Sequence, residues 1–224
     1  MVRWAFKVAG NAPSISVARL MAILFALALL SASIGAQPRP LTPLDASGRI
    51  TFFVDEGESE SGFRSPDREL ATWAVKAWER AIDGKLRFEA ANRDSALVHV
   101  LWVPADGNEF GEMRRLVVNG RPGAAVFIRP DVSALGPELS RLAREDPLVR
   151  ETIVYMTCLH EIGHAIGLVH TANYRDIMFF FGYGGDIPNY FLRYRKQLQS
   201  RGDIATVPGL SETDIAAVRK LYVR

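Results

Sequence analysis

The stretch HEIGHAIGLVH, residues 160–170, places three of the chain's four histidines within eleven positions. His160 and His164 are four residues apart. On a helix with 3.6 residues per turn, they therefore stand one above the other on the same face. Both imidazoles can then reach one metal ion, and neutral imidazole is among the ligands that zinc prefers. The spacing predicts a helix that carries two ligands of one zinc ion.

A third ligand from the same stretch requires this helix to end. If the helix continued, His170 would lie about 9 Å further along the axis than His164 and on a different face. Gly167 removes this difficulty, because glycine accepts the positive φ that ends a helix and reverses the chain. We therefore expect Gly167 to act as the helix breaker. His160, His164 and His170 then bind one catalytic zinc ion, which keeps an open fourth position.

Glu161 follows the first ligand and is rotated off the ligand face, so it can hold a water molecule without binding the metal. In the His-Glu-x-x-His arrangement this glutamate is the general base. Zinc lowers the pKa of its water from about 15.7 towards 7. Glu161 is expected to take the proton and pass it to the leaving amine of a peptide bond. The alternative is that His160 and His164 are ordinary polar residues of an amphipathic helix.

The run from His160 to His170 resembles HExxHxxGxxH, the zinc-binding helix of the metzincin-clan metallopeptidases. The sequence Asp176-Ile177-Met178 is similar to the Met-turn that lies beneath the metal in that clan. Within the clan the chain is most similar to the matrixins, the matrix-metalloproteinase-like branch. The resemblance covers residues 48–224, most strongly 160–178. Weaker similarities concern the first helix and following strand, the substrate-side edge strand and the C-terminal helix, at residues 73–88, 123–128 and 210–222.

The resemblance implies an α+β fold in which a twisted, mostly parallel sheet with an antiparallel edge strand packs on two long helices plus a C-terminal helix. It also implies a secreted zinc endopeptidase that acts on proteins or peptides, with Met178 in a structural Met-turn. Animal matrixins hold a second zinc and calcium in a His- and Asp-rich loop. Residues 104–125 contain no histidine and one aspartate, Asp106. The sequence therefore does not support a second zinc, and it gives little support for a structural calcium ion.

Matrixins usually have a proline two residues after the methionine of the Met-turn, and Phe180 occupies that place here. In the family this segment lines the pocket for the residue after the scissile bond. A preference for apolar residues at that substrate position is therefore a hypothesis.

Residues 1–36 have the pattern of a secretory signal peptide. Arg3, Lys7 and Arg19 precede the apolar run 20–30, and small residues suited to cleavage follow it. Eleven strictly apolar residues are few for a membrane span, which needs about 20, although an uncleaved anchor remains the alternative. We expect secretion to the extracellular space or periplasm, a linker at 37–47 and a metallopeptidase domain at 48–224, without stable membrane association after cleavage.

Cleavage would remove three of the 27 basic residues and none of the 25 acidic ones, leaving 24 basic against 25 acidic residues. This balance does not indicate a nucleic-acid partner, and it leaves the oligomeric state open. Cys158 is the only cysteine. It is expected to be a small buried apolar residue. His99 is expected to pack within a strand rather than to bind metal.

Periodicity and turn residues predict the remaining elements. Ser65 is expected to cap a helix that has Pro66 at its first position and ends at Asp83-Gly84. A capping box over 211–214 is expected to open the last helix. The expected strands are 49–54, 85–90, 96–103 and a hairpin of 114–118 with 124–128, whose second arm is the edge strand, and the other expected helices are 137–145, 147–166 and 190–199.

Two other classes of function stay open. The first is a zinc-bound module that binds peptides without cutting them. Glu161 argues against it, because such a module has no use for a base beside the metal. The second is a membrane-tethered interaction protein that retains its N-terminal helix.

Overall fold

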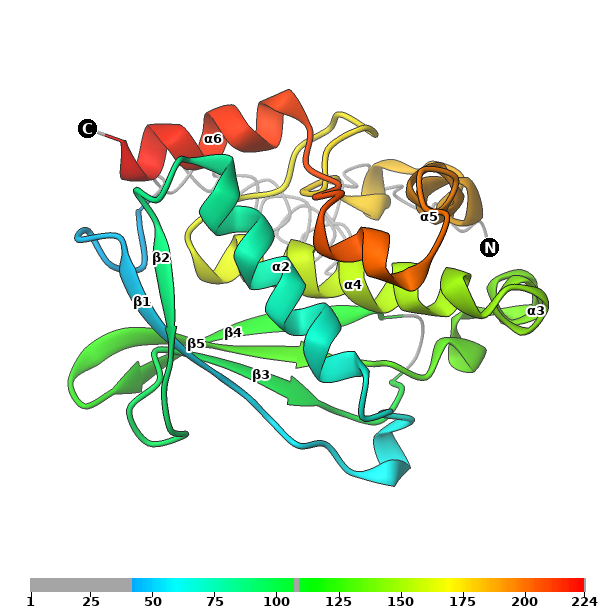
Figure 1. Ribbon diagram of the computed structural model, residues 1–224, viewed down its shortest axis with the longest axis horizontal. Helices are drawn as coiled ribbons and strands as arrows, with labels where there is room; N and C mark the ends of the chain where they lie inside the picture. Colours follow the sequence, from blue (N-terminus) through cyan, green and yellow to red (C-terminus); the bar gives the residue numbers. More distant parts are fainter. Residues whose placement is uncertain (1–41, 107–108, 224) are drawn as a thin grey trace, which may run out of the picture. The chain divides into compact units, whose positions relative to one another are not determined.

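The computed structural model describes residues 42–106 and 109–223 (Figure 1), and a five-stranded sheet in the order β2-β1-β3-β5-β4 organises them. The pairs β1–β2, β1–β3 and β3–β5 are parallel, and β4–β5 is antiparallel. The predicted mostly parallel sheet with an antiparallel edge is therefore confirmed. The predicted signal peptide and the start of the linker lie outside the described residues. The strands are β1 Arg49–Val54, β2 Arg87–Ala90, β3 Val98–Trp102, β4 Gly111–Val118 and β5 Arg121–Ile128.

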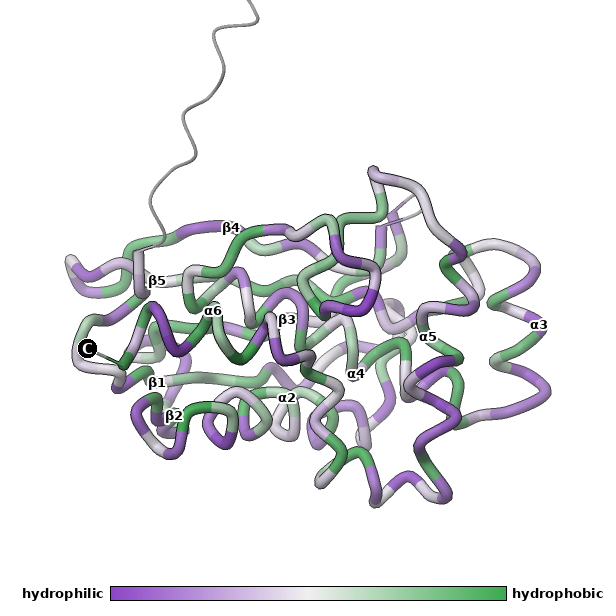
Figure 2. Tube along the Cα trace, turned by 90° about the horizontal axis from the view of Figure 1, so that it is seen from above, coloured by the Kyte–Doolittle hydropathy of each residue, from purple (hydrophilic) through white to green (hydrophobic). Residues whose placement is uncertain are grey.

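The edge strand of the hairpin is its first arm, β4, so the prediction that residues 123–128 form the edge is wrong. β5 lies between β3 and β4, and its run from Gly123 to Val126 is buried, as in other central strands. β4 instead carries Arg114 and Arg115, and Figure 2 shows hydrophilic positions along it. Charged side chains are typical of edge strands, because they hinder pairing with other chains.

The hairpin turn consists of two residues, Asn119 and Gly120, with φ of 50° and 77°. Positive φ at both positions is characteristic of a type I′ turn, whose twist suits antiparallel strands. β4 ends at Val118 as predicted, whereas β5 begins at Arg121, closer to the turn than the predicted start at residue 124.

Five α-helices occur in the described residues, and Figure 1 shows them on one side of the sheet. α2 and α4 pack against each other and against the sheet, and α6 lies further out. This agrees with the predicted two long helices and a C-terminal helix. The helices are α2 Asp67–Ala81, α3 Pro137–Glu145, α4 Pro147–Ala165, α5 Ile187–Arg195 and α6 Glu212–Tyr222.

The start of α2 differs from the prediction. The helix begins at Asp67 with Pro66 at the capping position, and Ser65 does not cap it. The carboxylate of Asp67 accepts a hydrogen bond from the Arg64 backbone N–H and pairs with Arg150 of α4 at 2.7 Å. Both partners of the ion pair are buried, so it ties the first turn of α2 to the first turn of α4.

Part of the predicted linker packs on the end of α4. The backbone N–H of Leu44 donates to the hydroxyl of Tyr222 at 3.1 Å. The same hydroxyl donates to the carbonyl of Ile166 at 2.8 Å. The chain before β1 therefore contacts the region where the helix of the histidine pair ends.

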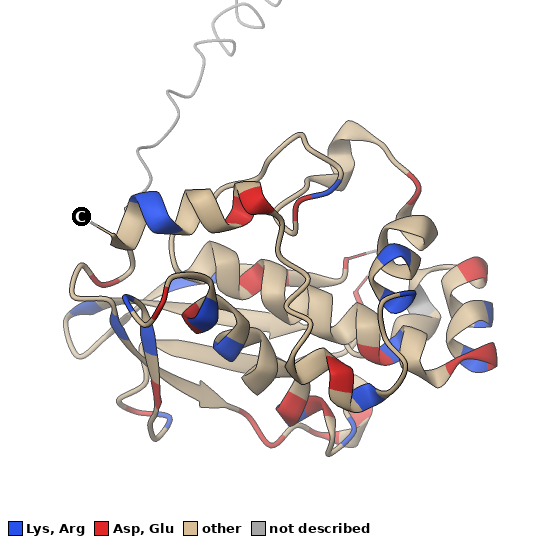
Figure 3. Cartoon of the chain, turned by 45° about the horizontal axis from the view of Figure 1, so that its top comes forward, with Lys and Arg blue, Asp and Glu red and all other residues tan. Residues whose placement is uncertain are grey.

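The surface carries charges of both signs. α3 and α6 each bear basic and acidic residues, as Figure 3 shows. Among the described residues, we find no helix with the length and apolar character needed to cross a bilayer.

Candidate metal centre

α4 provides a rigid support for the histidine pair. Asp146 caps its first turn by accepting a hydrogen bond from the Leu148 N–H at 3.0 Å, and Pro147 occupies the first turn. Most of its 19 residues are buried between the sheet and the other helices. The indole N–H of Trp78 in α2 donates to the carbonyl of Leu159 at 3.0 Å. This hydrogen bond therefore fixes α4 relative to α2 at Leu159, the residue before His160.

The chain reverses directly after α4. Gly167 has φ of 110° and donates to the His164 carbonyl at 3.0 Å, and Leu168 donates to the Gly163 carbonyl at 2.9 Å. These two hydrogen bonds form a Schellman motif, in which glycine occupies the left-handed position. A Cβ at Gly167 would also lie 2.3 Å from the carbonyl oxygen of Thr42. Glycine therefore meets both the backbone and the packing requirement of the reversal.

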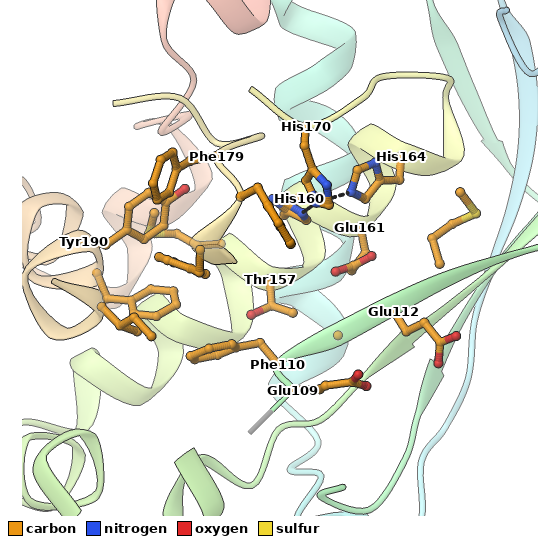
Figure 4. Close-up of a pocket in the computed structure, with 17 residues that line it drawn as sticks. Glu109, Phe110, Glu112, Thr157, His160, Glu161, His164, His170, Phe179 and Tyr190 are labelled. Carbon is orange, nitrogen blue, oxygen red and sulfur yellow. Dashed lines mark hydrogen bonds between the residues drawn. The ribbon is translucent and has the colours of Figure 1, made fainter. Parts of the chain in front are cut away.

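The reversal brings His170 to the pair on α4, and the three imidazoles converge (Figure 4). The Nε2 atom of His170 lies 3.3 Å from that of His160 and 3.1 Å from that of His164. Two nitrogen ligands of one tetrahedral zinc, each 2.0–2.1 Å from it, are separated by about 3.3 Å. Among the described residues these three form the group that could bind a metal ion.

Backbone carbonyls orient the two histidines of α4. His160 Nδ1 lies 2.6 Å from the Ile177 carbonyl oxygen, and His164 Nδ1 lies 3.0 Å from that of Leu168. A carbonyl accepts only, so each Nδ1 donates and each Nε2 presents its lone pair to the centre. This is the tautomer that a metal requires.

Burial also keeps the imidazoles neutral. It lowers the pKa of His160 to about 3, helped by the neighbouring His164 and His170. Burial lowers the pKa of His170 to about 4, with a further contribution from His164, and it lowers the pKa of His164 as well. Neutral histidine is the form that binds metals, so the site is prepared for an ion near neutral pH.

Glu161 lies next to the triad but does not belong to it. Its carboxylate points into the space between α4 and β4 (Figure 4). Burial raises the pKa of Glu161 to about 8, and the charge of Glu112 adds to this effect while Arg129 opposes it. A divalent cation held by the histidines would lower this pKa, because an opposite charge favours the carboxylate. The arrangement suits a group that accepts and returns a proton.

Met178 packs against α4 at Gly163, which lies between His160 and His164 in the sequence. It is 1% exposed, and a Cβ built on Gly163 would lie 2.5 Å from its sulfur. Gly163 is therefore the position of α4 that lets the methionine approach the ligand helix. The same Cβ would lie 3.1 Å from Cζ2 of Trp78.

The carboxylate of Asp214 holds the turn around Met178. From the sequence, this residue was expected only to take part in a capping box. Asp214 caps α6 with Ser211 as predicted. Its Oδ2 also accepts from the Ile177 N–H at 2.8 Å, and its Oδ1 from the Met178 N–H at 3.4 Å. Because the Ile177 carbonyl is the acceptor for His160, Asp214 acts through the turn on the first ligand. No local sequence signal indicated this contact, since the cap alone accounted for Asp214.

An apolar cavity of about 490 Å³ opens beside the histidines. Its size is typical of ligand pockets. Glu109, Glu112 and Thr157 contribute polar groups to its lining (Figure 4). The sequence had indicated only the segment after Met178, and β4 and α5 supply the other walls. The apolar and aromatic lining residues are Phe110, Met113, Met156, Phe179, Phe180, Phe181, Ile187, Tyr190 and Phe191.

Two other candidate residues lie apart from the triad. His99 is on β3, with Nε2 2.9 Å from the Ala96 carbonyl oxygen. Cys158 is fully buried in α4, and burial raises the pKa of its thiol. Both behave as packed residues, in agreement with the prediction.

The chain matches no protein-family model, and no curated protein matches it in sequence.

Proposed function

We propose that the chain is a zinc-dependent endopeptidase of the metzincin clan, similar to the matrixins. One observation carries the proposal: three Nε2 atoms meet at distances suited to a single tetrahedral ion, with the Glu161 carboxylate beside them. His160, His164 and His170 would hold the zinc. The signal peptide at 1–36 and secretion belong to the same proposal.

Zinc bound there would supply Lewis acidity for the scissile carbonyl and a more acidic water. Glu161 takes a proton from the attacking water as the new C–O bond forms. It then delivers this proton to the amine nitrogen as the C–N bond breaks. The buried position of Glu161 excludes bulk water from this transfer.

The free edge of β4 can bind an extended peptide substrate. Within the described residues no strand pairs with the outer side of β4. A peptide can add to such an edge through main-chain hydrogen bonds. β4 thus takes the role that the resemblance had assigned to residues 123–128. The apolar cavity is suited to the side chain that follows the scissile bond.

A peptide-binding module without catalysis would share the histidines, the cavity and the edge strand. It would have no use for a buried carboxylate beside the metal. Burying a charge is costly, so Glu161 favours the enzyme.

The test is hydrolysis of casein by the purified chain, together with its zinc content. We expect one zinc per chain, cleavage into fragments, inhibition by 1,10-phenanthroline and recovery on adding zinc. A chain that lacks stoichiometric metal, or cleavage that is insensitive to the chelator, would overturn the proposal. Zinc binding with peptide capture but no cleavage would identify the non-catalytic module.

A further inference from the structure

The third histidine is oriented differently from the other two. Nδ1 of His160 and of His164 each faces a backbone carbonyl of the turn region. Among the described residues, Nδ1 of His170 has no such acceptor, and the hydrogen-bond contacts of this ring reach only the other two imidazoles. Metal-binding histidines normally have an outer partner that fixes the ring. His170 therefore needs another source of orientation.

Phe180 provides a contact of the required kind. Its ring stacks on the imidazole of His170, with centroids 4.7 Å apart and an angle of 27° between the planes. Phe180 is nevertheless 42% exposed. The ring is thus only partly buried. The ring lies over the His170 imidazole and also lines the adjacent cavity, together with the other phenylalanines of the segment.

The backbone and a glycine hold Phe180 in this place. Its N–H donates to the Thr171 carbonyl at 3.2 Å, which joins the residue after His170 to the Met-turn segment. A Cβ on Gly182 would lie 2.2 Å from Cε1 of Phe180. Tyr183 contacts the Phe180 ring edge-on, with centroids 5.3 Å apart. The absence of a side chain at position 182 therefore allows the ring to fold over His170.

We propose that Phe180 is a positioning residue for the third metal ligand. Its ring fixes the plane of the His170 imidazole by stacking, as the carbonyls of Ile177 and Leu168 fix the other two rings by hydrogen bonds. The inference rests on the metal site of the proposed function but not on hydrolysis. Fixing the ring before the metal arrives reduces the ordering that binding requires, and so strengthens binding.

Zinc affinity measured by competition with a chromophoric chelator tests this role. Phe180→Ala should weaken zinc binding about tenfold, at the lower end of the 10- to 100-fold loss found for outer partners of metal ligands. Phe180→Tyr and Phe180→Trp should restore most of the affinity, because they keep a ring. Gly182→Ala should weaken binding in the same direction by pushing the ring aside. Phe53→Ala is the matched control, since it removes a phenylalanine ring that contacts His99, a histidine outside the triad, with centroids 6.2 Å apart.

Two further readouts separate positioning from folding. The melting temperature in chelator should be the same for wild type and Phe180→Ala. The visible spectrum of the cobalt-loaded protein should change in Phe180→Ala and Gly182→Ala but not in Phe53→Ala. Wild-type affinity and spectrum in Phe180→Ala, or an equal loss in Phe53→Ala, would overturn the inference. Failure of the wild-type chain to bind zinc would overturn the proposed function as well.

Discussion

Gly111, the first residue of β4, lies directly against the side chain of Glu161. A Cβ built on Gly111 would be 2.8 Å from Cγ and 3.1 Å from Oε1 of Glu161. It would also be 2.7 Å from Cγ2 of Thr157, one turn earlier on α4. Because position 111 has no side chain, the edge strand β4 can lie close to Glu161, the proposed general base.

Substituting Gly111→Ala should displace the Glu161 carboxylate while leaving the three histidines in place. We expect kcat for peptide cleavage to fall at least tenfold with zinc affinity unchanged. Overpacking should also lower the free energy of unfolding by about 1–3 kcal/mol. Steady-state kinetics, chelator competition and urea unfolding measure the three quantities.

Two variants control this experiment. Gly202→Ala adds a methyl group where the nearest atom is 3.7 Å away, and it should change none of the three quantities. Adding Thr157→Ser to Gly111→Ala removes the contact with Cγ2 and leaves the contact with Glu161. The double variant should regain stability but not activity. Full recovery of kcat would show that the packing against Thr157, and not the contact with Glu161, is what matters.

Glu161→Gln keeps the shape of the side chain and removes its ability to take a proton. We expect kcat to fall by about 10²–10⁴, the usual contribution of a general base, with one zinc retained per chain. His164→Ala should instead lose both zinc and activity. Metal analysis and cleavage of a fluorogenic peptide distinguish the two effects. Substantial hydrolysis by Glu161→Gln would remove Glu161 from the mechanism.

Removing the metal should lower the stability of the folded chain. We expect zinc to bind the assembled triad and not the dispersed histidines of the unfolded chain. A free zinc concentration 1,000 times Kd therefore adds about 4 kcal/mol to the free energy of unfolding. For a chain of this size, that corresponds to a rise of roughly 10 °C in the melting temperature. Calorimetry with zinc and with a chelator measures the shift, and equal melting temperatures would count against a specific site.

Asp214→Ala should weaken both the fold and the metal site. It leaves the buried N–H of Ile177 without its acceptor, which costs about 1–3 kcal/mol. Because the same peptide segment orients His160, zinc affinity should also fall. Asp203→Ala is the control, since Asp203 serves a similar capping box at Ser200 without reaching the Met-turn. An equal effect of both substitutions on zinc affinity would show that Asp214 acts only as a helix cap.

Features that depend on neighbouring residues could be predicted from the sequence. The cap at Ser211 was anticipated because a capping side chain binds backbone groups two or three positions away. The reversal at Gly167 was anticipated for the same reason, since positive φ is a property of one residue. The expected cap at Ser65 is not formed: the helix begins at Asp67, whose carboxylate accepts from the Arg64 N–H and pairs with the distant Arg150.

The sequence by itself determined the ligand helix, the glycine that ends it and the three histidines as one candidate set. The spacings i, i+4 and i+10 act through the local geometry of a helix and its end. Only the tertiary structure decided that β4 is the edge strand, that Asp214 holds the turn around Met178, and that Gly111 and Phe180 lie against Glu161 and His170. Most of these contacts join elements that are distant in the sequence. The contact of Phe180 with His170 depends on how the segment after Met178 folds back over the histidines. Neither residue type nor periodicity along the chain specifies such distances.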